Sequence, residues 1–525
     1  MKTSLLGLWS FALVIAVLSA SAQAPTTPAT ETLAAVLRAD QPGPIINRNL
    51  YGQFAEHLGR CIYEGLWVGE GSSIPNTRGI RNDVVAALKK LDLPVLRWPG
   101  GCFADEYHWK DGIGPRELRP KVYNSHWGGI VENNAFGTHE FLDLCEQLGT
   151  EPYIGINVGS GSVQEMMQWI EYLTSDGDTP MATLRRANGR DKPWHVKYLG
   201  IGNESWGCGG SMRPEFYADL YRQYQQFAKN YGDNRIYKIA CGSNGEDYNW
   251  TDVLMKNAAK QMNGLSLHFY TLPTGDAGWR GKKGSATDFN EDDYLATLRR
   301  TIRMDELITK HAAIMDTYDS GNEVGLVVDE WGTWYDVEPG TNPGFLYQQN
   351  SMRDAIVAAL NFNIFHRHAN RVVMANVAQM VNVLQAMILT DKEKMLLTPT
   401  YHVFEMYKVH QGATFLPLEL QPATDKMPSP FRPFMTTASR DASGAIHVSV
   451  ANPDLHHSLT LRCKLAGAKP KTVSGRILTA PTINTCNTFA EPNAVQPVIY
   501  SGATIAGDTL ELTLPAKSIV VVELK

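Results

Sequence analysis

The sequence predicts an α/β protein, a (β/α)8 TIM barrel with a C-terminal antiparallel β-sandwich domain. Strand-like and helix-like segments alternate from about residue 50 to residue 395, and eight such strands favour a closed parallel barrel over an open sheet. Beyond about residue 399, short alternating runs are separated by Gly and Pro turns, which is typical of an antiparallel sandwich. With 525 residues, the chain is long enough to form both units.

The chain divides into four predicted segments. They are a signal peptide (1–22), a linker with an N-terminal strand that joins the sandwich (23–48), the catalytic barrel (49–395) and the β-sandwich (396–525). The leader is predicted because Lys2 precedes an apolar run that ends in small residues at 20–22. We therefore expect an exported protein, periplasmic or secreted. No membrane anchor is expected, because the apolar run is short for a span and has no Cys near the cleavage point.

The barrel elements follow one another in a regular order. The eight expected strands are 50–54, 94–98, 152–158, 196–202, 237–241, 265–270, 324–328 and 371–377, and the expected helices are 81–91, 139–148, 163–173, 214–231, 291–318, 352–366 and 402–409. In the sandwich, the clearest alternating runs are 446–450, 459–463, 510–514 and 518–524. Alternation of period two marks half-buried strands, whereas the longer periodic segments mark amphipathic helices.

Composition excludes some partners. A net charge of −6 and a pI near 6.2 give no sign of nucleic-acid binding.

His366 and His368 lie at a predicted helix C-terminus. Such side chains interact favourably with the helix dipole there, so we expect no metal at this pair.

Seven cysteines allow up to three disulfides in an exported protein. Cys463 and Cys486 both lie in the strand-rich tail and are the best disulfide candidates. Cys102 and Cys208 follow predicted strand ends, and we expect them to be free buried thiols rather than a bridge.

Two carboxylates carry the predicted chemistry. Glu204 ends the fourth strand and Glu330 the seventh, and each is followed within two residues by a Trp whose ring could pack against a sugar. Active sites of this fold gather at the C-terminal strand ends, so the two acids should share one site. Such a pair is typical of a glycoside hydrolase. Taken singly, Glu204 could cap a turn and Glu330 could form a rim salt bridge.

Several motifs resemble the α-L-arabinofuranosidases of glycoside hydrolase family 51, from about residue 33 to 525. They are Gly-Asn-Glu-Ser-Trp-Gly-Cys-Gly-Gly (202–210), Asp-Glu-Trp-Gly-Thr-Trp-Tyr (329–335), Phe-Ala-Glu-His-Leu-Gly-Arg-Cys (54–61), Arg-Trp-Pro-Gly-Gly-Cys-Phe (97–103), Leu-His-Phe-Tyr (267–270), Glu-Asn-Asn-Ala-Phe-Gly (132–137) and Asn-Val-Ala-Gln-Met-Val-Asn (376–382). The resemblance implies hydrolysis with retention of configuration, no metal or cofactor, and a homohexamer.

The resemblance also assigns roles to residues. Glu204 would be the acid/base and Glu330 the nucleophile. The other implied roles are hydrogen bonds to the sugar hydroxyls (Glu56, Asn203, Gln379), contact with the sugar (Cys102), orientation of the nucleophile (Tyr270), a place beside the acid/base (His268) and aromatic walls toward the leaving group (Trp127, Trp334). Ser205 stands where an Asn is expected, which changes only the rim.

The expected activity is removal of terminal, non-reducing α-L-arabinofuranosyl residues from arabinan, arabinoxylan or their oligosaccharides. An endo-β-glucanase or a β-xylosidase on the same scaffold would keep both acids but open the site into a groove. A non-catalytic carbohydrate-binding protein would be expected to lack one of the acids, and both are present.

Overall fold

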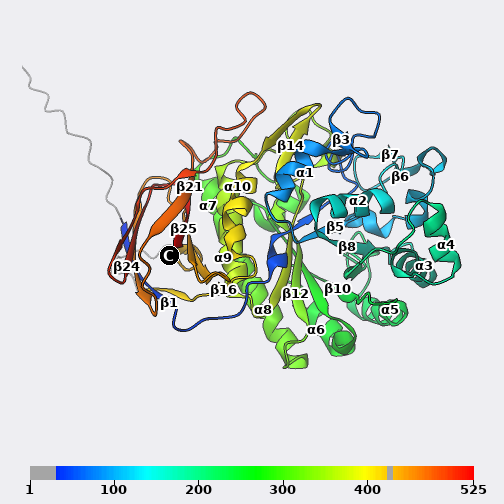
Figure 1. Ribbon diagram of the computed structural model, residues 1–525, viewed down its shortest axis with the longest axis horizontal. Coiled ribbons are helices and arrows are strands. Elements are labelled where there is room, and N and C mark those ends of the chain that lie inside the picture. The colour runs from blue at the N-terminus through cyan, green and yellow to red at the C-terminus, as the bar shows by residue number, and fades with distance from the viewer. Residues whose placement is uncertain (1–30, 422–429) are drawn as a thin grey trace, which may run out of the picture.

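The computed structural model describes residues 31–421 and 430–525 (Figure 1). The expected signal peptide at 1–22 lies outside the described residues. A barrel and a sandwich lie side by side along the long axis of the molecule, with the last helices of the barrel between them. None of the helices within the described ranges is long and apolar enough to span a membrane.

The predicted barrel is confirmed. Eight parallel strands close in the order β10-β11-β12-β13-β2-β5-β8-β9. Their bounds are β2 Gly52–Phe54, β5 Val95–Trp98, β8 Glu151–Ile156, β9 Tyr198–Ile201, β10 Tyr237–Asn244, β11 Gly264–Thr271, β12 Gly325–Thr333 and β13 Val372–Val377. A separate cluster of buried side chains, which includes Tyr153, Tyr198 and Met374, fills the barrel interior. The barrel therefore has a packed core, and its site lies in the loops.

Helices cover the outside of the barrel. Their bounds are α1 Asn82–Lys89, α2 Thr138–Leu148, α3 Val163–Thr174, α4 Pro180–Ala187, α5 Pro214–Phe227, α6 Tyr248–Ala258, α7 Glu291–Thr301, α8 Arg303–Tyr318, α9 Met352–Arg367 and α10 Pro399–Tyr407. The single helix expected over 291–318 is two helices that meet at Ile302. No Gly or Pro marks that junction, so periodicity alone could not place it.

The sandwich consists of two sheets. One has the order β17-β1-β20-β24-β23 and the other β16-β18-β19-β25-β21-β22. Their bounds are β1 Glu31–Arg38, β16 Thr414–Phe415, β17 Leu418–Leu420, β18 Thr436–Arg440, β19 Ile446–Asn452, β20 Leu459–Ala466, β21 Val473–Thr479, β22 Val498–Ile499, β23 Ala503–Ala506, β24 Thr509–Leu514 and β25 Ser518–Leu524. Strand β1 pairs parallel with β20, and Ala35 lies opposite Cys463. This ladder therefore departs from the antiparallel pattern.

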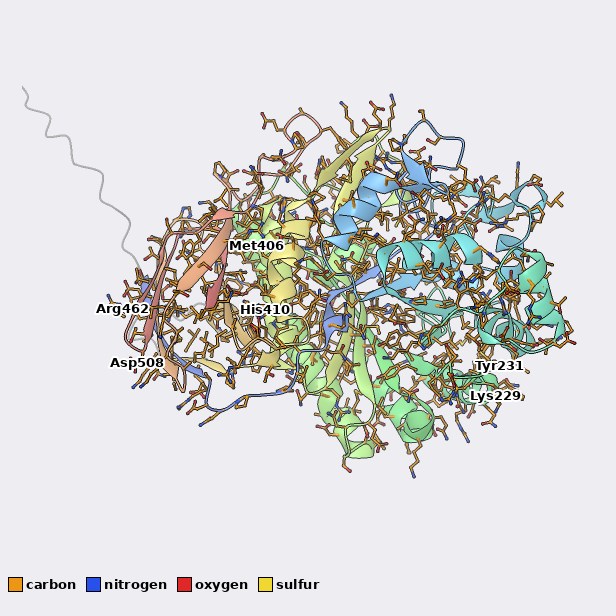
Figure 2. The ribbon with its side chains drawn as sticks, in the orientation of Figure 1. Lys229, Tyr231, Met406, His410, Arg462 and Asp508 are labelled. Carbon is orange, nitrogen blue, oxygen red and sulfur yellow. A yellow bond between two sulfur atoms is a disulfide. The ribbon has the colours of Figure 1, made fainter. Side chains whose placement is uncertain are left out.

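Helix α9 joins the two units. All of its residues except Arg367 are buried, because it packs against β12 of the barrel and against β18, β19 and β25 of the sandwich. His366 at its end bonds Tyr51 and Thr437. Figure 2 shows His410 in the same layer, between the hydroxyls of Ser439 and Ser449 at 2.7 Å each. These histidines are structural, and burial lowers the pKa of His366 to about 3.

Three two-stranded hairpins complete the fold. They are β3 Asn76–Thr77 with β4 Ile80–Arg81, β6 Val122–Asn124 with β7 Ile130–Glu132, and β14 Ile388–Asp391 with β15 Lys394–Leu397. The β6–β7 hairpin matters for the site, because its connecting loop carries Trp127. The Asn124 side chain fixes that loop by donating to the carbonyl of His57 at 2.7 Å and accepting from the backbone N–H of Trp127 at 3.0 Å.

Candidate active site

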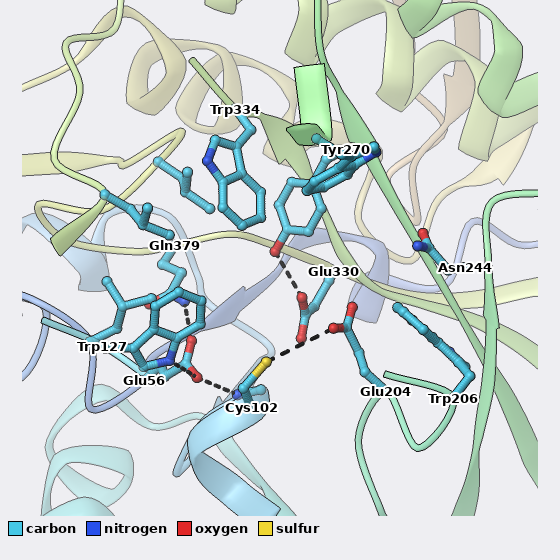
Figure 3. Close-up of a pocket in the computed structure, with 15 residues that line it drawn as sticks. Glu56, Cys102, Trp127, Glu204, Trp206, Asn244, Tyr270, Glu330, Trp334 and Gln379 are labelled. Atoms are coloured by element: carbon cyan, nitrogen blue, oxygen red, sulfur yellow. Dashed lines mark hydrogen bonds between the residues drawn. The ribbon is translucent and has the colours of Figure 1, made fainter. Parts of the chain in front are cut away.

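A pocket of about 340 Å³ opens at the C-terminal ends of the barrel strands (Figure 3). This volume is near the lower end of the roughly 300–1,000 Å³ usual for small-molecule sites. Carboxylates and aromatic rings dominate its wall. The lining residues are Glu56, Leu58, Gly101, Cys102, Trp127, Glu204, Trp206, Asn244, Tyr270, Trp279, Glu330, Trp334, Leu346, Gln379 and Leu384.

Glu330 belongs to strand β12 and is held at both carboxylate oxygens. Arg97 on β5 donates from Nη1 to Oε1 at 2.8 Å, and the Tyr270 hydroxyl on β11 donates to Oε2 at 2.8 Å. A Cβ at position 101 would lie 2.8 Å from Oε1, so glycine is needed there. Charge-assisted hydrogen bonds of this kind favour the carboxylate anion.

Trp331 does not face the pocket. Successive strand residues point to opposite faces, and since Glu330 points inward, Trp331 points outward. It is fully buried and stacks on Phe404 of α10 at 6.1 Å between ring centroids. The expectation that this ring packs against a sugar is therefore wrong. Trp206, which follows Glu204, does line the pocket.

Arg97 links the groups beneath the pocket. Its Nη2 donates to Oδ1 of Asn203 at 2.6 Å, and its guanidinium lies 4.5 Å from the centre of the Phe54 ring. Burial opposes its charge, but Asp329 and Glu330 hold the pKa of Arg97 above its usual range. Burial likewise opposes ionisation of Asp329, yet Arg97 and His268 keep the pKa of Asp329 below its usual value.

Glu204 lies in the turn after β9 and has a different environment. Its backbone has a φ of 40°, and its side chain is 18% exposed, against 6% for Glu330. Oε1 faces Nδ1 of His268 at 2.9 Å, whereas Oε2 faces sulfur atoms. Burial raises the pKa of Glu204, and repulsion from Glu330 adds to the rise. A carboxyl group with a raised pKa is suited to act as an acid.

His268 donates at both ring nitrogens. Nδ1 faces Glu204 at 2.9 Å and Nε2 faces Oδ1 of Asp329 at 3.1 Å. Both partners are carboxylates, so both nitrogens carry hydrogen and the ring is an imidazolium. Although burial opposes the charge, Glu330, Asp329 and Glu204 raise the pKa of His268 to about 10. With Oε1 of Glu204 occupied by this ring, a proton on Glu204 belongs on Oε2, toward the pocket.

Asp105 fixes the backbone of the Glu204 turn. Its Oδ1 accepts from the N–H groups of Val158 and Gly159 at 2.7 and 2.8 Å, and its Oδ2 accepts from the N–H of Asn203 at 3.0 Å. Burial raises the pKa of Asp105 to about 7 despite these donors. This buried carboxyl group thereby ties the end of β8 to the end of β9.

Two expectations about the cysteines are wrong. Cys102 and Cys208, expected as free thiols, form a disulfide beside Glu204. Cys463 and Cys486, expected as the best disulfide candidates, are both free. Cys463 is buried in the sandwich core, whereas Cys486 pairs in a β-bridge with Ser351 beside the barrel. Disulfide formation depends on distance in space, which position in the sequence does not give.

Glu56 forms the opposite wall of the pocket. Its Oε1 accepts from the N–H of Gly101 at 2.9 Å and from Nε1 of Trp127 at 2.9 Å, and its Oε2 accepts from Nε2 of Gln379 at 2.7 Å. Burial, followed by repulsion from Glu330, raises the pKa of Glu56 to about 7. The Gln379 Oε1 atom is buried without a partner among the described residues, and so is free to accept from a ligand.

Aromatic rings form the outer rim. Trp334 packs edge-on against both Tyr270 and Trp279, with 5.1 Å between ring centroids in each case. Trp279 is 41% exposed, so it presents part of its ring to solvent at the mouth. Exposed indoles at the mouth of a polar pocket are suited to pack against a sugar beyond the enclosed unit.

The structure brings together the ten residues to which the family resemblance assigns a role in the site. Glu56, Cys102, Trp127, Glu204, Tyr270, Glu330, Trp334 and Gln379 line the pocket. Asn203 and His268 lie directly behind this wall and are buried. Outside the site, His366 bonds Tyr51 and Thr437, and His368 bonds Asp305. Within the described ranges, two groups place three metal-ligand atoms within 4.8 Å of one another, Cys102-Glu204-Cys208 and Glu204-His268-Glu330.

Three charged residues of the site were missed. Arg97, Asp105 and Asp329 are all nearly inaccessible to solvent. Arg97 and Asp329 interrupt apolar strands, and a charge inside a buried strand needs a partner, so that signal was available. Asp105 lies in a short 3-10 helix, Cys102–Asp105, and nothing in its neighbourhood in the sequence indicates its role.

Comparison with known proteins identifies relatives over nearly the whole chain. The family described as "Alpha-L-arabinofuranosidase 1 domain" matches residues 87–284, and the "Alpha-L-arabinofuranosidase C-terminal domain" matches residues 329–518. An "Intracellular exo-alpha-L-arabinofuranosidase" of Bacteroides ovatus is 56% identical over 93% of this chain and 95% of its own length. A "Probable alpha-L-arabinofuranosidase C" of Aspergillus niger is 31% identical over 84% of this chain and 88% of its own length.

A solved structure has the same fold. The GH51 arabinofuranosidase from Xanthomonas axonopodis pv. citri superposes with a TM-score of 0.91 at 54% identity, covering 94% of this chain and 100% of that one. The Bacteroides relative contradicts one expectation, because its name describes an intracellular enzyme. That finding points away from export, so the expectation of a periplasmic or secreted protein is wrong.

Proposed function

This chain belongs to the α-L-arabinofuranosidases of glycoside hydrolase family 51, and from that membership we propose that it removes terminal, non-reducing α-L-arabinofuranosyl residues from arabinan, arabinoxylan or their oligosaccharides. The reaction is exo-acting and retains the anomeric configuration. An endo-acting glucanase or a β-xylosidase is not favoured, since the relatives reported above are named as arabinofuranosidases.

One observation carries the mechanism. A carboxylate oxygen of Glu204 and one of Glu330 lie within 4.8 Å of each other. Carboxyl groups about 5–5.5 Å apart are found in retaining glycosidases, whereas inverting enzymes keep about 6.5–9.5 Å to admit a water molecule. The short separation therefore supports a double displacement.

The two acids divide the work. Glu330, held by Arg97 and Tyr270, attacks the anomeric carbon, while Glu204 transfers its proton from Oε2 to the departing oxygen. The product of this step is a glycosyl ester on Glu330. In the second step Glu204 takes a proton from water, and that water attacks the anomeric carbon on the face opposite Glu330, the face from which the first leaving group departed, and displaces Glu330 as a carboxylate.

The remaining residues bind the sugar. Glu56, Gln379 and Asn203 supply hydrogen-bonding groups for the hydroxyls, and Nδ2 of Asn203 and Oε1 of Gln379 are buried without partners among the described residues. The sulfur of Cys102 contacts the ring. Trp127 and Trp334 form walls on the leaving-group side, where the rest of the substrate extends into solvent. A small pocket with an open rim suits a terminal sugar on a longer chain.

We also propose a homo-oligomer, a hexamer, as the family resemblance implies. Three exposed apolar side chains near the β6–β7 hairpin offer a contact surface: Leu118 is 76% exposed, Tyr123 66% and Val131 62%. Light scattering that gives the mass of a single chain at working concentration would exclude this assembly.

A substrate panel tests the activity. The enzyme should cleave aryl α-L-arabinofuranosides and release arabinose from arabino-oligosaccharides, with little action on aryl β-xylosides or cello-oligosaccharides. NMR of the first-formed sugar, before mutarotation, should show the α-anomer. A β-anomer would exclude the double displacement, and preference for xylosides or glucans would exclude the substrate.

A further inference from the structure

Cys102 lines the pocket next to Glu204 and forms a disulfide with Cys208. Cys102 follows strand β5, and Cys208 lies in the turn after β9, 106 residues away. The Oε2 atom of Glu204 is 3.5 Å from Sγ of Cys208 and 4.0 Å from Sγ of Cys102. Figure 3 shows the Cys102 sulfur directed at the Glu204 carboxyl group inside the pocket. The mechanism proposed above makes no use of a bond between these sulfurs.

Two of the three distances between these atoms are close to those of a tetrahedral metal site. With bonds of about 2.3 Å to sulfur and about 2.0 Å to oxygen, a zinc ion separates sulfur and oxygen ligands by about 3.5 Å and two sulfur ligands by about 3.8 Å. Both sulfur-to-oxygen distances here are already close to that value. Only the two sulfur atoms are too close together, because they are joined by a covalent bond, and reduction releases them.

We propose that reduction of the Cys102–Cys208 disulfide creates a binding site for a thiophilic divalent cation, such as Zn²⁺ or Cd²⁺, with the two Sγ atoms and Oε2 of Glu204 as its ligands. A dithiol reductant supplies the two electrons and two protons. Its thiolate attacks one sulfur, the S–S bond breaks, and its second thiol releases the protein as two thiols while the reductant becomes a cyclic disulfide. The cation then displaces both thiol protons, together with the proton on Oε2 of Glu204, into solvent.

The surroundings of Glu204 suit this role. Nδ1 of His268 bonds Oε1, which orients the carboxylate and leaves Oε2 for the cation, as outer partners do in metal sites. Cys102 and Glu204 both line the pocket, through which a cation can reach them. The other candidate group, Glu204-His268-Glu330, is less suitable, because both nitrogens of His268 already donate hydrogen bonds and Arg97 adds a positive charge.

Cation binding would stop the proposed reaction. A cation on Oε2 occupies the oxygen that transfers the proton, so the general acid is lost. The disulfide therefore protects the acid/base from thiophilic metals, and the reduced enzyme is open to reversible inhibition. This inference goes beyond the proposed function, and the binding measurement below does not depend on which substrate the enzyme cleaves.

The test compares the oxidised and reduced forms of the full chain. Thiol titration of denatured protein should count five free thiols before reduction and seven after it. After removal of the reductant, Cd²⁺ titration should give thiolate-to-cadmium absorption in the ultraviolet that saturates at one cation per reduced chain, with none for the oxidised chain. With Cd²⁺ bound, the activity of the reduced enzyme should fall by about 10²-fold or more, the cost of losing a general acid. A chelator that removes the Cd²⁺ should restore the activity.

Variants locate the site. Cys102→Ser and Cys208→Ser should each weaken Cd²⁺ binding by more than about 100-fold, because each removes a direct ligand. Loss of a residue that only contacts a ligand costs about 10–100-fold. Cys486→Ser is the matched control, since this half-buried free thiol lies outside the pocket. It should leave both absorption and inhibition unchanged. Equal Cd²⁺ binding by the oxidised and reduced forms, or loss of the signal in Cys486→Ser alone, would overturn the proposal. The comparison of the two redox forms needs no variant, so a folding defect in one variant does not decide it.

Discussion

Glu330 and Glu204 follow similar stretches of sequence, yet the protein holds them in different ways. Glu330 is part of a barrel strand, and fixed donors from two other barrel strands, Arg97 on β5 and Tyr270 on β11, reach its two oxygens. Glu204 lies one turn beyond its strand with a left-handed backbone. One of its oxygens faces a histidine and the other faces sulfur and the pocket. A strand position favours an anion with fixed geometry, whereas a turn position leaves one oxygen free to give and take a proton.

The contrast explains the opposite proposed roles of chemically identical side chains. A nucleophile must keep its charge and its place, so contacts at both oxygens serve it. An acid/base must hold a proton near neutral pH and then release it. Burial of the Glu204 carboxyl group favours this protonated form, and no cationic side chain within the described ranges contacts Oε2, the oxygen that faces the pocket. Each variant below disturbs one side of this contrast, beginning with the largest expected effect.

Glu330→Gln should remove turnover of every substrate. The amide has the same shape and can still accept from Arg97, but it cannot form the glycosyl ester. We expect a loss of at least about four orders of magnitude, whatever the leaving group. Steady-state rates on aryl arabinofuranosides and on arabino-oligosaccharides measure this, with the thermal unfolding midpoint as the control for folding. Rates within tenfold of wild type from pure protein would refute the assignment of the nucleophile.

Glu204→Ala should instead give a loss that depends on the leaving group. Protonation matters greatly for a sugar leaving group and little for a nitrophenolate. Arabino-oligosaccharide cleavage should therefore fall by about 10²–10⁴-fold, while formation of the glycosyl ester from a dinitrophenyl arabinofuranoside survives in part. Azide needs no base, so it should restore turnover and give the α-arabinofuranosyl azide.

Burst kinetics and product NMR measure these two effects. If good and poor leaving groups slow equally and azide has no effect, Glu204 is not the acid/base and the contrast with Glu330 fails.

His268→Gln should shift a pH limit. Through its hydrogen bond and its charge, His268 lowers the pKa of Glu204 against the effect of burial. Without the imidazolium that pKa rises, and because Glu204 must be protonated to act as acid, the basic limb of kcat/KM should move to higher pH. The rate at the optimum should fall by about 10- to 100-fold, since hydrogen bonds to charged groups contribute about 1.5–3 kcal/mol. A lower rate with an unmoved basic limb would show that His268 acts only on folding.

The sequence predicts much of this site because its residues lie at or just beyond the C-terminal ends of strands. A motif at that end of a strand in a (β/α)8 barrel must lie at the catalytic end, so Glu204 and Glu330 could be brought together without coordinates, whereas the role of Tyr270 came from the family resemblance. Trp331 shows the limit of adjacency, since strand alternation turns it away from its neighbour. The bond between Cys102 and Cys208, as well as the role of Asp105, depends on how loops from different strands meet, and local pattern does not determine that.

Asp105→Asn should have the smallest effect and act on the Glu204 side alone. The carboxyl group of Asp105 accepts three backbone N–H groups, one of them from Asn203. An amide can accept through one oxygen only, so its NH₂ group would face an N–H donor and the turn that carries Glu204 would shift. None of these contacts reaches Glu330. We expect arabino-oligosaccharide cleavage to fall by about tenfold, a cost of about 1.4 kcal/mol for a misplaced general acid.

The ratio of rates on two substrates is the decisive readout. Cleavage of nitrophenyl arabinofuranosides, which depends mainly on Glu330 in the first step, should slow less than cleavage of oligosaccharides. An equal loss of rate on both substrates would show that the two sides are not separable.

A pH series of unfolding temperatures supplies the control. Because burial raises the pKa of Asp105 to about 7, above its unfolded value of about 3.9, the folded protein binds the extra proton. Its contribution to stability is present at low pH and is lost as pH rises through 7. Asn does not titrate. The difference in unfolding temperature between Asp105→Asn and wild type should therefore shift in favour of the variant as the pH rises from below that pKa to above it.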